Sequence, residues 1–582
     1  MIKKLAKYVG EYKKQAILCP IFMIGEVVME MLIPLIMATI VDDGIEVGNI
    51  KVVTICGILM VCAALISLFF GAMAARMSAV ASCGFSKNLR RGMYTNIQDF
   101  AFENIDKFST ASLVTRLTTD VNMVQMSFQT IIRMCFRAPI QFVTALIMAI
   151  TISPRLSLIL SIAIPILVVG LALIMNKAMP YFKQMFKKID KLNSVVQENL
   201  IGIRVVKAFV REEHEKEKFE QAAEDVKAYS TRAQKITILN NPLMQFVMYA
   251  VMIAICWIGG NMVIEQTEVF GQVLSKGDLL SFITYCMQLL MSLMMVSMVF
   301  VMITMSRTSA QRICEVLDER TTLSNNDNPI TEVVDGSIDF ENVSFSYSND
   351  LSNPTLEGIN IHINSGDTVG IIGGTGSGKT TLVQLIPRLY DVSSGSLKVG
   401  GIDVRDYDIE SLRNKVAMVL QKNVLFSGSI IENLKWGNES ATMEEIIDAC
   451  KKSQAHDFIE SFPDKYETDL GQGGVNVSGG QKQRLCIARA LLKKPNIIIL
   501  DDSTSAVDTK TDALIRQSFK ESLPNVTKII IAQRIASVED ADMIIVLDNG
   551  KVSAYGKHDE LMKSSEIYKE VYESQKKGAE DE

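Results

Sequence analysis

The sequence has few charges, little positive excess and no closely paired cysteines. Charged residues make up 21% of its 582 residues, and 59 Lys and Arg stand against 65 Asp and Glu. A net charge of −6 leaves no basic excess for a nucleic-acid backbone, so we expect no nucleic-acid partner. The 10 Cys residues form no CxxC pair. This spacing indicates neither a zinc module nor a secreted disulfide framework.

What the sequence does contain is long apolar stretches in its first half. Hydrophobic residues reach 48% of the chain, and about 20 apolar residues cross about 30 Å of hydrocarbon. Two spans carry charges: 16–41 holds Glu26 and Glu30, and 128–153 holds Arg133 and Arg137. Four further stretches have no charge at all: 52–74, 156–175, 243–264 and 279–305. We therefore predict six membrane spans.

Lys and Arg residues predict the orientation of these spans. They are frequent at the N-terminus and in the connections 76–127 and 177–240, whereas the alternate connections hold only Lys51, Arg155 and Lys276. The positive-inside rule then places both termini in the cytoplasm. No small-residue cleavage site follows the first span, which predicts an anchor rather than a removed signal peptide. Helical periodicity in the two long connections predicts helices that continue into the cytoplasm and touch a cytosolic element.

The second half contains a glycine-rich loop between a β-rich run and a periodic helix. Its residues are Gly373, Gly374, Thr375, Gly376, Ser377, Gly378, Lys379, Thr380 and Thr381. Glycines at this spacing let backbone N–H groups close around phosphates. Lys379 supplies a positive charge to the β- and γ-phosphates, and the Thr380 hydroxyl can ligate Mg²⁺. The alternative, a simple glycine turn, does not explain the full eight-residue pattern.

The second motif is a pair of acidic residues that follows an apolar strand at 497–500. Asp501 and Asp502 end this run, and a strand beside the phosphate loop would bring Asp501 to the metal. Alone, the motif would most often be a buried strand with a polar turn. Together with the phosphate loop it predicts a nucleotide hydrolase.

Between these motifs, Val477-Ser478-Gly479-Gly480-Gln481 resembles the signature of ATP-binding-cassette proteins. The resemblance extends along essentially the whole chain. The segment 198–215 is similar to the second intracellular coupling segment of exporters with six spans fused to one cassette. Tyr347 matches the aromatic residue that stacks on adenine, Gln421 the glutamine that links Mg²⁺ to the membrane domain, and Ser505, Ala506, Val507 and Asp508 the D-loop.

The resemblance implies a fold and a partner. The fold is an α-helical membrane domain of six long spans followed by an α/β P-loop NTPase domain. The expected division is a membrane domain at 1–310, a linker at 311–335, a cassette at 336–575 and a charged tail at 576–582. Two cassettes of this family pack head to tail, so a second half-transporter is implied. Tyr347 and the phosphate loop would bind this chain's ATP, and Thr380, Gln421 and Asp501 its Mg²⁺. Ser478, Gly479, Gly480, Gln481 and Asp508 would serve the partner's ATP.

Two positions depart from the family pattern. Asp502 stands where the family usually has the Glu that polarises the attacking water, and Gln533 stands where it usually has a switch His. Asp is shorter by about 1.5 Å, and Gln cannot carry a positive charge. The chain therefore resembles the degenerate-site subunit of a bacterial heterodimeric multidrug-type exporter, with Glu and His in the partner.

The membrane half gives weaker indications of cargo. Glu26 and Glu30 share one helical face and fit either a cation-binding site or a structural pair bonded to Arg133 or Arg137. A methionine stripe fits helix packing or a cavity wall; its members are Met287, Met291, Met294, Met298, Met302 and Met305. We predict export of small amphipathic or lipophilic compounds across a bacterial cell membrane. Alternatives are a lipid or peptide exporter and a nucleotide-gated sensor or channel.

Overall fold

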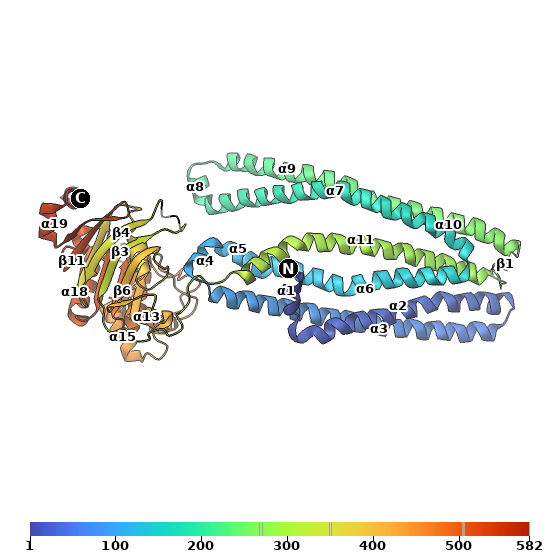
Figure 1. The fold of residues 1–582 in the computed structure, drawn as a ribbon, viewed down its shortest axis with the longest axis horizontal. Helices are drawn as coiled ribbons and strands as arrows, with labels where there is room; N and C mark the ends of the chain where they lie inside the picture. The colour runs from blue at the N-terminus through green and yellow to red at the C-terminus, as the bar shows by residue number, and fades with distance from the viewer. Residues whose placement is uncertain (267, 270–271, 349, 351, 503–506, 581–582) are drawn as a thin grey trace. The chain divides into compact units, whose positions relative to one another are not determined.

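The computed structural model describes residues 1–582 except 267, 270–271, 349, 351, 503–506 and 581–582 (Figure 1). The described chain divides into two compact units. The helical unit comprises Met1–Gln98 and Thr110–Glu319, and the α/β unit comprises Asp99–Ser109 and Arg320–Glu582. A short piece of the connection between the second and third predicted spans therefore belongs to the α/β unit.

The helical unit consists almost entirely of long helices, as its apolar runs predict. Ser153 and Pro154 separate two of them, because the Ser153 Oγ accepts from Leu156 N at 3.4 Å and proline suits a first helical position. The elements are α1 (Ile2–Lys7), η1 (Gly10–Tyr12), α2 (Lys13–Thr39), η2 (Ile40–Glu46), α3 (Ile50–Gln98), α5 (Thr110–Thr115), η3 (Arg116–Asp120), α6 (Val121–Ile152), α7 (Pro154–Ile201), α8 (Ile203–Ala208), α9 (Glu212–Thr237), α10 (Asn240–Ile264), β1 (Glu268–Val269), β2 (Gln272–Val273) and α11 (Lys276–Asp318).

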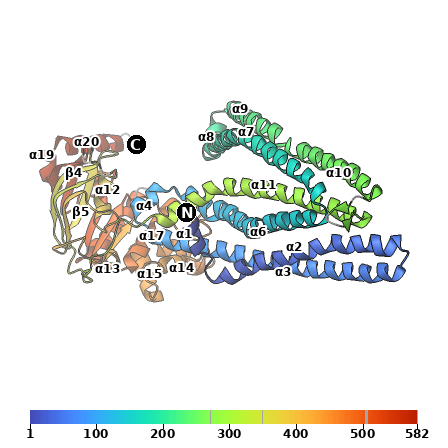
Figure 2. The same cartoon turned by 45° about the vertical axis from the view of Figure 1, so that its right-hand side comes forward.

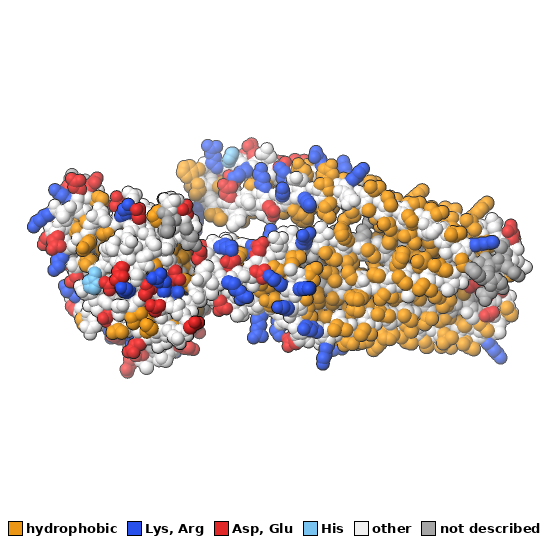
Figure 3. Space-filling view, viewed as in Figure 1, with side chains coloured by type: hydrophobic (Ala, Val, Ile, Leu, Met, Phe, Trp, Pro, Cys, Tyr) orange, Lys and Arg blue, Asp and Glu red, His pale blue; other side chains and the backbone are white. Residues whose placement is uncertain are grey.

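Six helical stretches of this unit are long and apolar enough to cross a membrane, which confirms the predicted number. They are Gly10–Glu46, Ile50–Gln98, Thr110–Ile152, Pro154–Ile201, Glu212–Ile264 and Lys276–Asp318. Five of the predicted spans lie inside one of them, whereas the predicted span 128–153 runs one residue past Ile152 to Ser153. Every stretch is longer than a bilayer requires. Apolar side chains cover the part of the unit around α2, α6 and α10, whereas charged side chains gather near α8 and the N-terminus (Figure 3). In both ribbon views α7 and α9 run side by side toward α8 (Figures 1 and 2).

The α/β unit alternates strands and helices. Its elements are α4 (Phe102–Lys107), β3 (Ile338–Phe345), β4 (Leu356–Ile363), β5 (Thr368–Gly373), α12 (Lys379–Leu385), β6 (Ser394–Val399), β7 (Ile402–Asp403), α13 (Ile409–Lys415), β8 (Val416–Val419), α14 (Ile430–Lys435), α15 (Met443–Lys452), α16 (His456–Glu460), η4 (Lys465–Glu467), α17 (Gly479–Leu492), β9 (Ile497–Asp501), α18 (Thr509–Ser522), β10 (Thr527–Ile531), η5 (Ile535–Ser537), β11 (Met543–Asp548), β12 (Lys551–Gly556), α19 (His558–Ser564) and α20 (Glu566–Glu580).

Two sheets organise this unit. One has the strand order β12-β11-β5-β10-β9-β8, and its strands β11, β5, β10, β9 and β8 are parallel. The other is antiparallel, in the order β4-β3-β6-β7. Strands β9 and β10 are buried along their whole length, which explains their unbroken apolar runs. The carboxyl ends of the parallel strands meet at one edge, where ligands bind in such sheets.

The strand order of this sheet decides how Asp501 comes near the phosphate loop. The strand that ends in Asp501 does not pair with the strand of the phosphate loop, because β10 lies between β5 and β9. Asp501 still reaches the loop, since its side chain projects from the carboxyl end of β9.

The segment 99–109 packs on the α/β unit through α4. The Tyr390 hydroxyl donates to Asp106 Oδ2 at 2.6 Å, and the rings of Phe102 and Tyr390 meet edge to face with centroids 6.1 Å apart. Burial and the adjacent Asp106 carboxylate raise the pKa of Tyr390, so this hydroxyl remains a donor throughout the neutral range. A segment of the connection between the second and third predicted spans is thereby fixed to the unit that carries the phosphate loop.

Candidate nucleotide site

The phosphate loop joins the end of β5 to the start of α12. Gly376 and Gly378 have φ angles of +82° and +95°, a region that favours glycine. A Cβ atom at Gly373 would overlap the carbonyl oxygen of Leu547, so this position also needs glycine. The loop conformation is therefore encoded by its glycines.

Lys379 is held inside this loop. Its Nζ donates to the carbonyl oxygens of Gly373 and Gly374 at 2.8 and 2.7 Å. Burial lowers the pKa of Lys379, and the carboxylates of Asp501 and Asp502 oppose that change. The buried Ser377 Oγ has no hydrogen-bond partner within the described chain. A partly desolvated cation beside an unsatisfied hydroxyl fits a phosphate group.

Thr380 and Asp501 form the second part of the site. The Thr380 hydroxyl donates to Asp501 Oδ1 at 3.1 Å, and Asp501 is 2% exposed. Burial raises the pKa of Asp501, with a smaller contribution from the Asp502 charge. A hydroxyl and a carboxylate are oxygen ligands that suit Mg²⁺. The described residues contain no cluster of three His, Cys, Asp or Glu side chains that could hold a metal, so Mg²⁺ here would also need phosphate oxygens.

Asp502 is engaged by two neutral amides. Gln533, which follows β10, donates from Nε2 to Asp502 Oδ2 at 2.6 Å. Gln421, which follows β8, approaches the same oxygen at 3.5 Å. Asp502 has φ +49° and is 9% exposed. The structure thus brings together the two positions that depart from the family pattern, although they lie 31 residues apart.

The Tyr347 ring lies next to the helix that follows the phosphate loop. Its hydroxyl is 3.1 Å from Thr381 Oγ1 and donates to Gln384 Oε1 at 3.4 Å. The ring meets Tyr390 edge to face with centroids 5.2 Å apart and is 47% exposed. An exposed aromatic face beside the loop can accept a flat base.

The signature residues begin α17. Ser478 Oγ accepts from Gln481 N at 3.3 Å and Gln481 Oε1 accepts from Ser478 N at 2.8 Å, which is a capping box. Ser478 and Gly479 are exposed, and Val477 is buried. Gln481 therefore has a structural role within its own chain.

Asp508 also caps a helix. Its Oδ1 accepts from Thr511 N at 3.0 Å at the start of α18. Of the D-loop residues, Ser505 and Ala506 lie outside the described residues. The roles of Asp508 and the signature toward a partner's nucleotide stay predictions.

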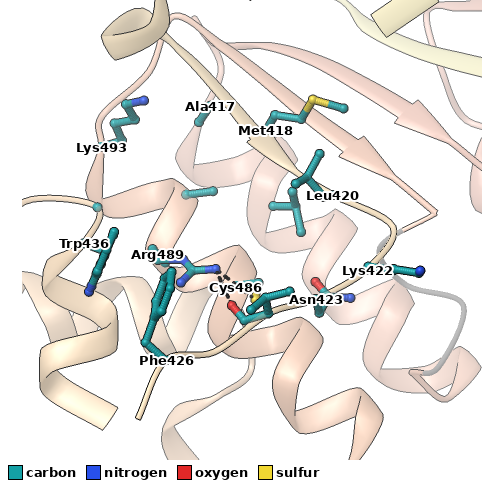
Figure 4. Close-up of a pocket in the computed structure, with 14 residues that line it drawn as sticks. Ala417, Met418, Leu420, Lys422, Asn423, Phe426, Trp436, Cys486, Arg489 and Lys493 are labelled. Atoms are coloured by element: carbon teal, nitrogen blue, oxygen red, sulfur yellow. Dashed lines mark hydrogen bonds between the residues drawn. The ribbon is translucent and has the colours of Figure 1, made fainter. Parts of the chain in front are cut away.

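The α/β unit also contains a cavity beside the segment that follows Gln421, and the sequence did not indicate it. This cavity of about 370 Å³ is lined by residues of β8, of α17 and of the segment that follows α14 (Figure 4). Phe426 and Trp436 stack in it with centroids 4.2 Å apart. Arg489 donates to the Val424 carbonyl oxygen at 3.0 Å. A stacked aromatic pair spaced ten residues apart has no sequence pattern of its own.

In the helical unit, both acidic side chains of the first span bind one arginine. Arg137 donates to Glu26 Oε1 at 2.6 Å and to Glu30 Oε1 at 2.7 Å. These three side chains are 14 to 27% exposed. The arrangement matches the structural alternative, with Arg137 rather than Arg133 as the partner in these ion pairs. Four members of the methionine stripe are exposed in the single chain: Met291, Met294, Met298 and Met305.

Comparisons with known proteins agree with this architecture. The model of the ABC transporter transmembrane region matches residues 16–293, and the ABC transporter model matches residues 356–505. The ABC transporter ATP-binding protein YfiB of Bacillus subtilis is 35% identical over 579 residues, which cover 99% of this chain and 98% of that protein. The chain belongs to the ABC transporter family.

Further relatives have the same full-length architecture. The ABC transporter ATP-binding protein Rv1273c of Mycobacterium tuberculosis is 33% identical over 580 residues, with 99% of this chain and 98% of that protein covered. A solved bacterial Atm1-family ABC exporter with ATP bound shares the fold, with a TM-score of 0.82 over 97% of this chain and 98% of that chain, at 23% identity.

This ABC transporter chain is therefore a multi-pass membrane protein with one nucleotide-binding domain. Such domains bind ATP with Mg²⁺ and couple its hydrolysis to transport, and half-transporters work as dimers. The residues of the loop fit this cofactor: Lys379 places a cation within the loop, and Thr380 with Asp501 offers oxygen ligands for the metal.

Proposed function

We propose that this chain is the slow-hydrolysing subunit of a heterodimeric ATP-driven exporter. The observation that carries the proposal is the 2.6 Å hydrogen bond from Gln533 to Asp502. The carboxylate next to the metal-binding Asp501 is occupied by an amide, and Gln421 approaches the same oxygen. A carboxylate that must align water needs a free oxygen directed at it.

The length of the Asp502 side chain and the charge of the Gln533 side chain support the same conclusion. Asp502 is about 1.5 Å shorter than the glutamate usual at this position, and a displacement of about 1 Å can lower a rate on the order of 10²-fold. Gln533 can donate a hydrogen bond but cannot bring a positive charge to the γ-phosphate. Both changes weaken hydrolysis and leave the groups that bind ATP intact.

The proposed partner is a non-identical half-transporter with Glu and His at these two positions. The exposed Ser478 and Gly479, with Gly480, Gln481 and Asp508, would close over the partner's ATP. Tyr347, the phosphate loop from Gly373 to Thr381, and Gln421 would hold this chain's own ATP. We also propose that the membrane domain ends near residue 310 and the cassette begins near 336.

The proposed cargo is amphipathic or lipophilic and leaves the cytoplasm across a bacterial cell membrane. The charged side chains gathered near α8 and the N-terminus support cytoplasmic termini (Figure 3). Lipid or peptide cargo is a second candidate within this class. The binding of both Glu26 and Glu30 by Arg137 argues against a free cation site in the first span.

Hydrolysis by the purified chain and by the complex tests the proposal. The chain alone should hydrolyse ATP slowly, and the complex with a Glu- and His-bearing partner should be much faster. Within the complex, Asp502→Asn should do modest harm, whereas Ser478→Ala should nearly abolish turnover. A fast homodimeric ATPase would contradict the proposal. Uphill transport into proteoliposomes separates an exporter from a nucleotide-gated channel, in which flux would be passive.

A further inference from the structure

The helix α20 is hydrogen-bonded to the loop that carries Gln533. Gln575 lies on this helix and directs both ends of its amide at the loop backbone. Its Oε1 accepts from Ile535 N at 2.9 Å, and its Nε2 donates to the Gln533 carbonyl oxygen at 2.7 Å. One side chain thus satisfies a backbone donor and a backbone acceptor two residues apart, as a neighbouring strand would.

Apolar packing holds α20 in place against this loop. Tyr568 of α20 is fully buried in the same hydrophobic cluster as Ile535 and Val538. His558 adds polar contacts, because its Nδ1 lies 2.8 Å from the Tyr568 hydroxyl and its Nε2 lies 3.4 Å from Glu539. A side chain on a packed helix can fix a loop more firmly than one on a mobile segment.

The other side of the same loop faces the nucleotide site. The Gln533 backbone is bound by Gln575, and the Gln533 side chain donates to Asp502 Oδ2. We propose that Gln575 is a positioning residue that keeps the Gln533 amide on the Asp502 carboxylate, so that α20 keeps this ATP site slow. The slow site rests on the proposed function; the clamp itself does not.

Three substitutions separate the two hydrogen bonds. Gln575→Met keeps the length of the side chain and removes both bonds. Gln575→Glu keeps an acceptor for Ile535 N and loses the donor to the Gln533 carbonyl oxygen. Lys576→Ala is the control, since Lys576 is the adjacent, exposed residue on the same helix.

Amide hydrogen exchange at Ile535 tests the clamp in the full chain, embedded in lipid nanodiscs. Gln575→Met should speed exchange of this amide about fivefold, the factor that matches one lost hydrogen bond. Gln575→Glu and Lys576→Ala should leave it at the wild-type rate. Unchanged exchange in Gln575→Met would overturn the inference, whatever the ATPase rate.

A double-mutant cycle tests the consequence for the site. The complex should carry Gln in place of the partner's proposed glutamate, so that the residual rate reports this chain's own site. Gln575→Met and Gln533→Ala should each raise this rate about fivefold, because each removes the Gln533 amide from the Asp502 carboxylate. Both together should give no more than either, whereas a merely structural role would make the effects multiply.

The cycle also distinguishes the two proposals. Multiplying effects, or an unchanged rate in Gln575→Met, would overturn the positioning role. A residual rate that is already fast in the unmodified chain would overturn the proposed function, and the exchange measurement would still decide whether the clamp exists.

Discussion

The two halves of the chain each hold carboxylates in place, but by different chemistry. In the helical unit one guanidinium binds Glu26 and Glu30, whereas in the α/β unit the neutral amide of Gln533 binds Asp502. Within a bilayer an unpaired charge is costly, so acidic groups there need an opposite charge. Beside a nucleotide, a neutral donor restrains a carboxylate without cancelling the charge that attracts Mg²⁺.

The largest expected effect comes from Lys379, the cation of the phosphate loop in the α/β unit. Lys379→Ala should sharply weaken ATP binding at this chain's own loop, since the phosphates lose their fixed positive partner. Binding of labelled nucleotide to the complex measures it, and Lys398→Ala, which removes a surface ion pair with Glu341, is the control. Equal affinity in Lys379→Ala and wild type would mean that the loop does not bind ATP.

The helical unit should respond most to loss of its central arginine. Arg137→Met leaves two acidic side chains without their partner and should destabilise the folded chain by about 3 kcal/mol or more. Adding Glu26→Gln and Glu30→Gln should restore much of the thermal stability in detergent. A selective loss of cationic cargo in the Glu26→Gln, Glu30→Gln variant, without loss of stability, would instead make these residues a transport site.

A smaller effect is expected where the segment 99–109 packs on the rest of the α/β unit. Tyr390→Phe removes the hydrogen bond to Asp106. It should weaken the stimulation of the ATPase by cargo, and the coupling free energy between cargo and hydrolysis should fall by about 1 to 2 kcal/mol. Tyr407→Phe loses a comparable bond to the Val399 carbonyl oxygen inside the unit and should leave the stimulation ratio unchanged. Similar losses in both variants would show that stability, rather than coupling, is affected.

The smallest effect concerns pH. Because the pKa of Asp501 is raised, the carboxylate proposed to bind Mg²⁺ is lost as pH falls through a value above the usual aspartate range of about 4. As pH falls through this range, the nucleotide-free folded chain becomes more stable relative to the unfolded chain, because the folded chain binds a proton at Asp501 more readily. The Mg²⁺ dependence of ATP affinity should therefore decline on acidification, and Asp502→Asn should lower the midpoint by removing one cause of the shift. A midpoint that Asp502→Asn leaves in place would remove Asp502 from this account.

The same contrast explains what could be predicted from the sequence. Phosphate binding requires particular residues at fixed spacing, so the loop from Gly373 to Thr381 could be predicted from the sequence. The six spans were readable because an apolar run of sufficient length has few alternatives. The bond between Gln533 and Asp502 was not, since the two residues follow different strands and either side chain had other directions available.

Other features depend on packing, which has no fixed sequence pattern. Arg133 and Arg137 lie one turn apart on the same helix, and only the structure shows that Arg137 binds the acidic pair. The insertion of β10 between β5 and β9 could not be inferred from motif order. The clamp by Gln575 involves an ordinary glutamine in a polar helix, without a distinctive motif.

Restoring the two unusual positions tests the central claim most directly. Asp502→Glu with Gln533→His should be introduced into the complex whose partner has lost its proposed glutamate, and steady-state ATP hydrolysis should be measured. If the short, amide-bound carboxylate makes this site slow, the residual rate should rise on the order of 10²-fold over the unmodified chain. A residual rate that is fast before the substitutions, or that does not rise after them in a complex that still binds ATP, would contradict the account.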